Sequence, residues 1–505
     1  MVRLVSLFAI VCPGLLGVAG CGTEPAQQSV QQSRAESGVV APVDSSPSAE
    51  RPQGSAEKPD ASSAAELPES DSAVIQAPDG GIQAARVVRP DDTRVRHDDS
   101  TLARGGVRHY ESPHISLYTD IDPQEVAGLL PAVEGVYKAW VKYFGELPPN
   151  RAGTEFQITG YVISDRETFD RMGLIPLDLP PFQNGRHRGA EFWMVNPRDD
   201  YYRRHLFLHE ATHCFMTFLE PAADPRPGWY LEGMAELFAT HRRAANGRFE
   251  FRVMPHNKTD FAGLGRITAL QAEVQSGAGL SLDEATRLPP AEYLSIRGYS
   301  WSWAVCCFLD AHPDYHDRFR SLGRQTTGNS FRRLLATSFQ SQLPQMDQQW
   351  AVYVAGLCDG YDVARAAFDL SRKATQLGQE FRVHSDRGWQ STGLVVRAGQ
   401  EYRLNASGRI TVAQLPKPWV SAPQGVSFRY VADRPIGRLL LAIRVDGDPR
   451  SMLQIVASGA DQVFEPAATG IVYLRVNDSG SELADNMGSY SARVVRNGAA
   501  AATDR

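Results

Sequence analysis

The stretch FLHEATHCFM, residues 207–216, constrains this chain more than any other part of its sequence. It contains no helix-breaking residue, so it favours a helix. On a helix, residues four apart share a face, and His209 and His213 can therefore both reach one metal ion. Glu210 lies about 100° further around the helix, where it can act on a water beside the metal instead of binding the metal itself. The pattern predicts a helix with one face built for a cation.

A second segment, WYLEGMAELFA at 229–239, supplies a candidate third ligand. Catalytic zinc takes three protein ligands and leaves one position open. Glu232 follows His213 after eighteen intervening residues, in a helical pattern that starts after DPRPG. We expect the two helices to pack together so that His209, His213 and Glu232 bind Zn²⁺. The alternative is that these residues form polar faces of two solvent-exposed helices.

Three neighbours of these ligands have simpler interpretations. Glu236 is one turn after Glu232 and could orient a ligand histidine, but an ordinary carboxylate of the second helix is the plainer interpretation. His205 is four residues before His209, and because three ligands already fill a zinc site, we expect it on the surface. Cys214 points away from the metal face and is expected in the core.

This arrangement resembles the gluzincin metallopeptidases, the clan of thermolysin and aminopeptidase N. Enzymes of the aminopeptidase N type carry HExxH, eighteen residues, and Glu within Asn-Glu-Gly-Phe-Ala, and residues 231–235 here read Leu-Glu-Gly-Met-Ala. The resemblance implies a zinc metallopeptidase that hydrolyses peptide bonds with a zinc-activated water, with Glu210 as the general base. No stretch similar to Gly-Ala-Met-Glu-Asn is present. We therefore expect an endopeptidase in preference to an aminopeptidase.

Two further expectations come from the same resemblance. The stretch RGYSWSWAVCCFL, residues 297–309, resembles the segment whose tyrosine stabilises the oxyanion, with Tyr299 as the candidate and Tyr293 as the reserve. A plain aromatic residue of an amphipathic helix is the alternative. The stretch GAEFWMVN, residues 189–196, resembles the edge strand that pairs with the substrate backbone.

The N-terminus has the features of an exported lipoprotein. Residues 1–21 carry one arginine, an apolar run and then Val-Ala-Gly-Cys, which resembles the bacterial lipobox, so cleavage and lipidation are expected at Cys21. A plain signal peptide is the alternative. Residues 22–100 are rich in Ser, Ala and Pro and predict a disordered tether. We expect a membrane-anchored protein outside the cytoplasm, at the outer membrane or cell surface in preference to the inner membrane.

The rest of the chain predicts an α+β fold in two domains. Residues 101–376 are expected to form a gluzincin-like metallopeptidase domain, and residues 377–500 an all-β sandwich of short alternating strands. Export permits disulfides, and Cys358 could pair with Cys306 or Cys307, although buried free thiols are equally compatible with the sequence.

The C-terminal stretch VNDSGSELADNMGSYSARV, residues 476–494, resembles the calcium loop and last strand of the galactophilic bacterial lectin. In that family Asn-Asp is followed after six residues by two side-chain oxygen ligands. Asp478, Asp485 and Asn486 occupy those positions here, and the resemblance implies a Ca²⁺ site with backbone carbonyls near Glu482 and Val412. An acidic, solvated turn is the alternative.

The sugar-contacting histidine of that lectin family has no counterpart in VSFRYVADRPIG, residues 426–437. We therefore expect an accessory or binding domain, with carbohydrate as one candidate partner, rather than a lectin for galactose. The net charge of −6 and the lack of a basic block argue against nucleic acid as a partner. The predicted partners are a peptide or protein substrate and the membrane, reached through the lipid anchor. The competing hypothesis is a catalytically silent surface lipoprotein that binds glycans or proteins.

Overall fold

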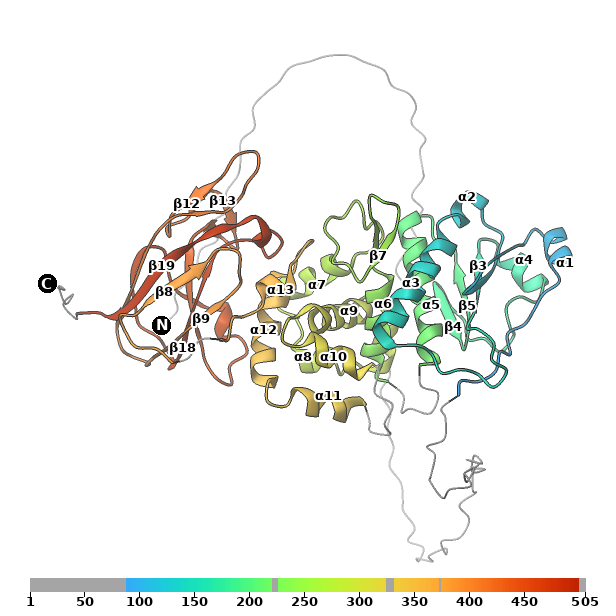
Figure 1. The fold of residues 1–505 in the computed structure, drawn as a ribbon, viewed down its shortest axis with the longest axis horizontal. Helices are drawn as coiled ribbons and strands as arrows, with labels where there is room; N and C mark the ends of the chain where they lie inside the picture. The colour runs from blue at the N-terminus through green and yellow to red at the C-terminus, as the bar shows by residue number, and fades with distance from the viewer. Residues whose placement is uncertain (1–87, 220–225, 324–330, 372–373, 499–505) are drawn as a thin grey trace, which may run out of the picture. The chain divides into compact units, whose positions relative to one another are not determined.

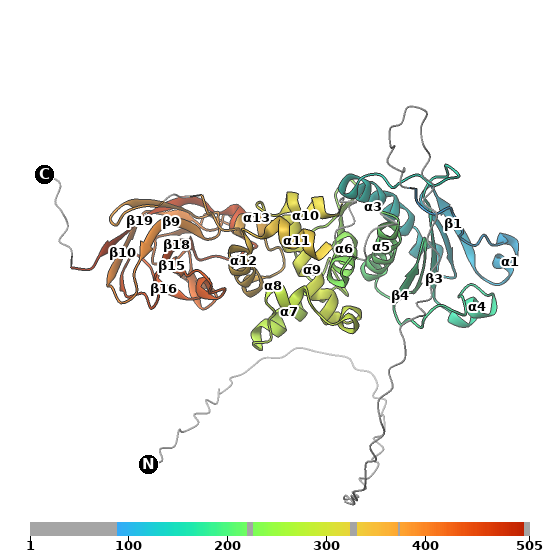
Figure 2. The same ribbon diagram turned by 90° about the horizontal axis from the view of Figure 1, so that it is seen from below.

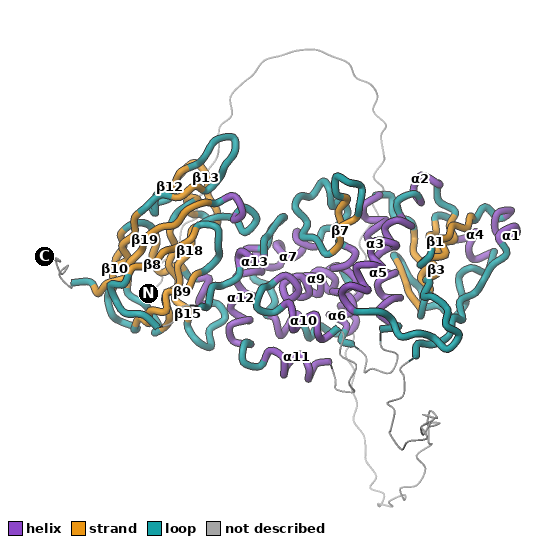
Figure 3. The backbone as a smooth tube through the Cα atoms, viewed as in Figure 1, coloured by secondary structure: helices purple, strands orange, loops and turns teal. Residues whose placement is uncertain are grey.

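The computed structural model describes residues 88–219, 226–323, 331–371 and 374–498. Across these residues the fold is α+β, with mixed helices and strands followed by a β-rich C-terminal region, as the sequence predicts (Figures 1 and 3). The predicted signal peptide, Cys21 and residues 22–87 of the predicted tether lie outside the described residues.

A five-stranded sheet opens the folded part. Its strand order is β1-β2-β3-β5-β4, with β2, β3 and β5 parallel and the two outer strands antiparallel to their neighbours. The strands are β1 (Arg108–Ser112), β2 (Ile115–Thr119), β3 (Ile158–Ile163), β4 (Gly185–Arg188) and β5 (Glu191–Val195). Every residue of β2 and β3 is buried, as expected for central strands covered on both faces.

Helices cover both faces of this sheet. Figure 2 shows α3 (Leu129–Phe144) and α5 (Asp200–Thr217) on one face, and α1 (Asp99–Arg104) and α4 (Arg166–Arg171) on the other. The side chain of Asp199 caps α5 by accepting a hydrogen bond from the Tyr202 amide. Because α5 is buried along most of its length, its His and Glu side chains lie inside the molecule.

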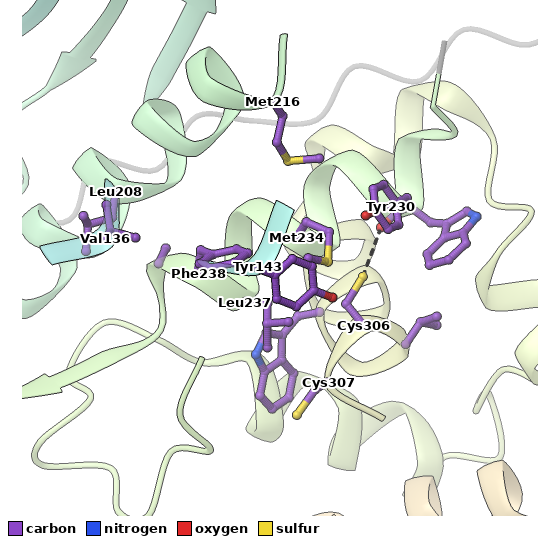
Figure 4. Close-up of a cluster of buried hydrophobic side chains, with 14 of the residues drawn as sticks. Val136, Tyr143, Leu208, Met216, Tyr230, Met234, Leu237, Phe238, Cys306 and Cys307 are labelled. Atoms are coloured by element: carbon purple, nitrogen blue, oxygen red, sulfur yellow. Dashed lines mark hydrogen bonds between the residues drawn. The ribbon is translucent and has the colours of Figure 1, made fainter. Parts of the chain in front are cut away.

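The second helix of the motif, α6 (Gly228–Ala239), lies between α5 and α9 (Ile296–Ala311). Gly233 of α6 permits a close approach to α9, because a Cβ at this position would lie 2.4 Å from the Ser302 carbonyl oxygen. The glycine of the Leu-Glu-Gly-Met-Ala stretch thus serves helix packing. Figure 4 shows the core that results, where Tyr230 and Met234 lie beside Cys306.

After α6, the strands β6 (His241–Arg243) and β7 (Phe249–Phe251) form a small hairpin. The other helical elements of the described residues are α2 (Pro123–Val126), α7 (Arg266–Gln275), α8 (Leu282–Ala285), η1 (Pro290–Leu294), α10 (His316–Leu322), α11 (Phe331–Phe339), α12 (Leu343–Gly356), α13 (Val363–Ala366), η2 (Ser451–Leu453) and η3 (Leu483–Asp485).

The C-terminal region contains two larger antiparallel sheets around their own apolar core. One follows the order β12-β11-β19-β10-β17, with β8 also paired to β19, and the other follows β16-β15-β18-β9. The strands are β8 (Glu380–His384), β9 (Gln390–Val396), β10 (Tyr402–Ser407), β11 (Ile410–Thr411), β12 (Val420–Ser421), β13 (Val426–Val431), β14 (Arg434–Ile436), β15 (Leu439–Arg444), β16 (Ile455–Ser458), β17 (Asp461–Phe464), β18 (Gly470–Val476) and β19 (Met487–Arg496).

Two details differ from the sequence-based expectations or narrow them. Residues 88–100, which we assigned to the tether, already make contacts, since Arg89 is buried and donates a backbone hydrogen bond to the Pro149 carbonyl. The four cysteines of the described residues are free thiols, so neither Cys306 nor Cys307 is bridged to Cys358. Cys214 is fully buried, as predicted. Among the helices that the structure describes, none has the length and apolar character needed to span a membrane.

Candidate metal centre

The structure brings the three predicted zinc ligands together from two helices. The Nε2 atoms of His209 and His213 are 3.1 Å apart, and Glu232 Oε2 lies 3.4 Å from the first and 3.3 Å from the second. Donor atoms bound to one tetrahedral zinc ion at about 2.1 Å are about 3.4 Å from each other. The spacing of the three atoms therefore fits a single small cation between them.

The charges of the cluster also fit a cation. Burial disfavours a charged imidazole, but the carboxylates of Glu232 and Glu236 outweigh burial and raise the pKa of His209 to about 10. Burial alone would raise the pKa of Glu232, yet His213 and His209 hold it well below its ordinary value. The two carboxylates thus favour a positive charge on His209, whereas burial lowers the pKa of His213. The same carboxylates would stabilise a bound divalent cation.

Glu236 lies beside Nδ1 of His209, the ring nitrogen on the side opposite the three converging donor atoms. One of its carboxylate oxygens lies 3.2 Å from His209 Nδ1, and the other lies 3.2 Å from His205 Nε2. Arg266, at the start of α7, donates two hydrogen bonds of 2.9 Å to the same carboxylate. A carboxylate behind a ligand histidine fixes the ring's orientation and tautomer. Glu236 therefore has the orienting position that the sequence left open.

The expectation that His205 lies on the surface is wrong. His205 is only 1% exposed, because α6 covers this face of α5, and its ring contacts Glu236. Burial lowers its pKa, which favours a neutral imidazole next to the carboxylate. The packing of the two helices was expected, but the spacing of His205 from His209 did not show that α6 also covers this turn of α5.

Glu210 lies beside the three ligands and is not one of them. Its side chain faces β4, where one oxygen is 3.5 Å from His187 Nδ1. A Cβ at Gly185 would come within 2.3 Å of the other oxygen, so a glycine is needed for Glu210 to occupy this position. The ring of His187 stacks on His213 with centroids 4.3 Å apart. Glu210 is thus next to the cluster but held by the sheet.

Tyr299 enters the site from α9. Its ring packs edge-on against His209 with centroids 5.7 Å apart, and the guanidinium of Arg266 lies over its other side. Burial, and then the charges of Glu232 and Glu210, raise the pKa of Tyr299 above its ordinary value, so its hydroxyl remains a donor. Tyr293, the reserve candidate, packs against Gly228 at the start of α6.

The strand that we predicted at the edge of the sheet is the second strand from that edge. Residues 191–195 form β5, which lies between β3 and β4, so the strand at this end of the sheet is β4 (Gly185–Arg188). The sequence of β4, Gly-Arg-His-Arg, is short and polar, with none of the apolar alternation that marked β5 as a strand. The chain turns at Gly189 between β4 and β5, so the polar strand β4 lies antiparallel to β5 at the edge of the sheet.

Sequence reasoning missed three residues of this site. Gly185 and His187 come from a strand that had no apolar pattern, and Arg266 comes from a helix 30 residues after Glu236. Only Arg266 carried a usable signal, because it follows Gly265 at the start of a helical stretch. All three depend on tertiary packing.

The second candidate site lies in the C-terminal loop. The carboxylate of Asp478 is buried and accepts hydrogen bonds from the side-chain amide of Asn486, at 2.8 Å, and from the Ser479 amide, at 2.7 Å. The Asn486 Oδ1 atom is buried and has no hydrogen-bond partner among the described residues. Asp485 is exposed, and its backbone carbonyl accepts a hydrogen bond from Gln414. The structure therefore groups Asp478 with Asn486, while the side chain of Asp485 faces solvent.

The side chains of the other two residues predicted near the calcium site, Glu482 and Val412, supply no further oxygen ligand. The side chain of Glu482 forms an ion pair with Arg429, so only its backbone carbonyl would be available. Val412 is buried and pairs with Trp419 through its amide. Burial raises the pKa of Asp478 to about 6.

Comparisons with known proteins give little further information. No protein-family model and no curated protein matches the chain. A solved structure described as the "EclA N-terminal domain; PllA-like lectin" is similar at 20% sequence identity and a TM-score of 0.18, covering 23% of this chain and 94% of that chain. At this TM-score the likeness supports no inference about fold or ligand.

Proposed function

We propose that this chain is a zinc metallopeptidase of the gluzincin type, anchored by a lipid outside the cytoplasm and acting as an endopeptidase. One observation carries the proposal: three donor atoms from His209, His213 and Glu232 converge at the spacing of a tetrahedral zinc site, with Glu210 beside them. A silent scaffold would have no need of Glu210 in this position.

The roles of the residues follow from their positions. His209, His213 and Glu232 would hold zinc, which polarises a peptide carbonyl and activates water when bound. Glu210 accepts the proton of the attacking water and returns it to the leaving amine. Tyr299 donates a hydrogen bond to the oxyanion. The substrate backbone pairs with the free edge of β4.

The test compares variants of a soluble chain that starts at residue 22 and therefore lacks both the signal peptide and Cys21. We expect about one zinc per chain and cleavage of a peptide library by the wild type. Glu210→Gln should keep zinc and lose cleavage, whereas Glu232→Gln should lose zinc as well. Glu465→Gln, at an exposed position of the β-rich region, is the matched control. Full zinc content with no cleavage of any peptide would favour the silent binding lipoprotein.

The anchor is a separate part of the proposal. Several acyl chains on Cys21 would together hold the protein firmly, because each buried methylene contributes about 0.8 kcal/mol. Cells expressing the full chain should incorporate labelled fatty acid into the protein and retain it in the membrane fraction. Cys21→Ser should abolish both, and incorporation that persists in this variant would exclude Cys21 as the site.

We also propose that the C-terminal region binds Ca²⁺ at Asp478 and Asn486, and that the exposed side chain of Asp485 turns inward to join them when the cation binds. The unpartnered Asn486 Oδ1 next to the buried Asp478 carboxylate supports this second site, since oxygen donors at this spacing suit a hard cation. Carbohydrate binding through such a site is the further candidate function. Calcium should raise the melting temperature and a chelator should reverse the rise. An unchanged melting curve for wild type and Asp478→Asn would exclude calcium.

A further inference from the structure

Strand β4 presents alternate residues to Glu210. Gly185 and His187 are two apart and therefore face the same side of the sheet, toward α5. Arg186 and Arg188 face the other side, where Arg188 lies over the Trp193 ring and pairs with Asp178. The two residues that face α5 both meet the carboxylate of Glu210, which suggests a shared role.

The contact between His187 and Glu210 is direct. His187 Nδ1 lies 3.5 Å from Glu210 Oε2, a separation that a small rotation closes to a hydrogen bond. Hydrogen bonds of catalytic groups are often long before substrate binds and shorten in the complex. The side chain of Glu210 is 7% exposed and that of His187 is 36% exposed. His187 is therefore the more exposed partner of this contact.

The ring of His187 is itself held in place. It stacks on His213 with centroids 4.3 Å apart and an angle of 17° between the rings. Gly185, on the same face of the strand, leaves room for the other oxygen of Glu210. One oxygen of the Glu210 carboxylate thus lies against the backbone of Gly185, and the other lies 3.5 Å from His187 Nδ1.

We propose that His187 is a positioning residue that orients the carboxylate of Glu210 for proton transfer. The inference rests on the proposed peptidase function, because it assumes that Glu210 transfers a proton. The position of Glu210 can nevertheless be tested by ligand binding, without peptide cleavage. A merely structural alternative exists, in which His187 only supports the ring of His213. The two roles predict different responses to substitution.

Acetohydroxamic acid is a probe that needs no turnover. It binds zinc through two oxygen atoms and passes a proton to a base beside the metal, so its affinity reports on whether Glu210 is in place. His187→Phe keeps a flat ring against His213 but removes the donor, and His187→Asn keeps a donor but removes the ring. His384→Phe, at an exposed histidine of β8, is the matched control.

In zinc-loaded protein, we expect His187→Phe to keep its zinc and to bind acetohydroxamate about tenfold more weakly, a loss typical of groups that support a metal site. His187→Asn should recover part of this affinity. Glu210→Gln should weaken binding too, and the double variant His187→Phe/Glu210→Gln should bind no more weakly than Glu210→Gln alone. On peptides, His187→Phe should lower kcat and leave KM unchanged.

Three results would overturn the inference: losses that multiply in the double variant, unchanged affinity in His187→Phe, or loss of zinc from His187→Phe, which would assign the residue to His213. Peptide cleavage bears on the proposed function separately. A wild type that cleaves no peptide, together with coupled losses in acetohydroxamate binding, would remove the peptidase proposal and leave the role of His187 standing.

Discussion

Glu236 accepts two hydrogen bonds from the guanidinium of Arg266, each 2.9 Å long, while its carboxylate also lies 3.2 Å from His209 Nδ1. Both partners of this ion pair are buried. The Glu236 carboxylate therefore serves two partners. It neutralises the buried guanidinium of Arg266, and it lies against the ring of His209, a candidate metal ligand. Changes at Glu236 should therefore affect both zinc affinity and folding.

We predict that Glu236→Gln lowers zinc affinity about 10- to 100-fold, since the ring of His209 loses its charged partner. It should also destabilise the fold by up to about 3–5 kcal/mol, because Arg266 becomes a buried cation without a counter-charge. Competition with a chelator measures the first effect and urea unfolding the second. Adding Arg266→Gln should restore stability but not zinc affinity. A double variant as unstable as the single one would contradict this separation.

Gly185→Ala tests the space that Glu210 occupies. A Cβ there would lie 2.3 Å from Glu210 Oε1, so the carboxylate must leave its present position beside Gly185. We predict full zinc content and at least a tenfold loss of kcat, as small displacements of catalytic groups have large effects. Gly128→Ala, where an added Cβ meets only the Arg204 side chain at 3.5 Å, is the control. Unchanged kcat would show that Glu210 is not constrained here.

The pattern of correct and incorrect predictions has a physical explanation. His209, His213 and Glu232 could be placed from the sequence because helical geometry fixes which side chains share a face. His205 obeys the same periodicity, yet the packing of α6 decides that it is buried. The local pattern thus predicted the three side chains that converge, whereas the position of their neighbours depended on tertiary contacts.

The sheet shows the same limit. The apolar residues of β5 identified a strand, but the strand order at the edge depends on the polar strand β4, which precedes β5 and pairs with it. His187 and Arg266 reach the site from segments outside the motif. The helix start at Arg266 can be recognised in the sequence, but its contact with Glu236 cannot. The α+β class follows from periodicity, and the surroundings of the metal cluster follow from packing.

Tyr299→Phe removes the hydroxyl proposed to stabilise the oxyanion and keeps the ring against His209. We predict a fall in kcat of about 10²- to 10³-fold, the effect of losing one oxyanion donor, with little change in KM. Because the pKa of Tyr299 is raised by burial and by nearby carboxylates, its contribution should persist across the neutral and mildly alkaline range. Steady-state kinetics of both forms at several pH values measures this. Equal kcat values would assign Tyr299 to packing alone.

His241 gives a pH dependence that does not involve the metal ligands. It is buried, donates from Nδ1 to the Ala239 carbonyl at 2.7 Å, and stacks on Tyr201. Burial lowers its pKa from 6.5 to about 3, so the unfolded chain takes up a proton that the folded chain does not. Its stability contribution is full above pH 6.5 and is lost as the pH falls toward 3.

We predict a loss of up to about 3 kcal/mol from this residue between pH 6.5 and 4.5. Unfolding by urea across this range should show a shallower acid slope in His241→Gln than in wild type. His256→Gln, at an exposed histidine paired with Asp260, is the control. Parallel slopes for wild type and His241→Gln would contradict the prediction.

Asp478 reverses the sign of this dependence. Burial raises its pKa from 3.8 to about 6, so the folded chain binds this proton more tightly than the unfolded chain. Without calcium, the stability present below pH 3.8 is lost as the pH rises through 6, by up to about 3 kcal/mol. Calcium would relieve this cost only where the carboxylate is charged.

The calcium-induced rise in melting temperature should therefore be larger at pH 7.5 than at pH 5. Asp478→Asn removes the titrating carboxylate, so in this variant the β-rich region should gain nothing from calcium at either pH. Asp461→Asn, at an exposed aspartate paired with Arg403, should behave as the wild type does. A calcium effect of equal size at both pH values would place the cation, if bound, away from Asp478, because only a ligand that exchanges a proton for the metal makes binding depend on pH in this window.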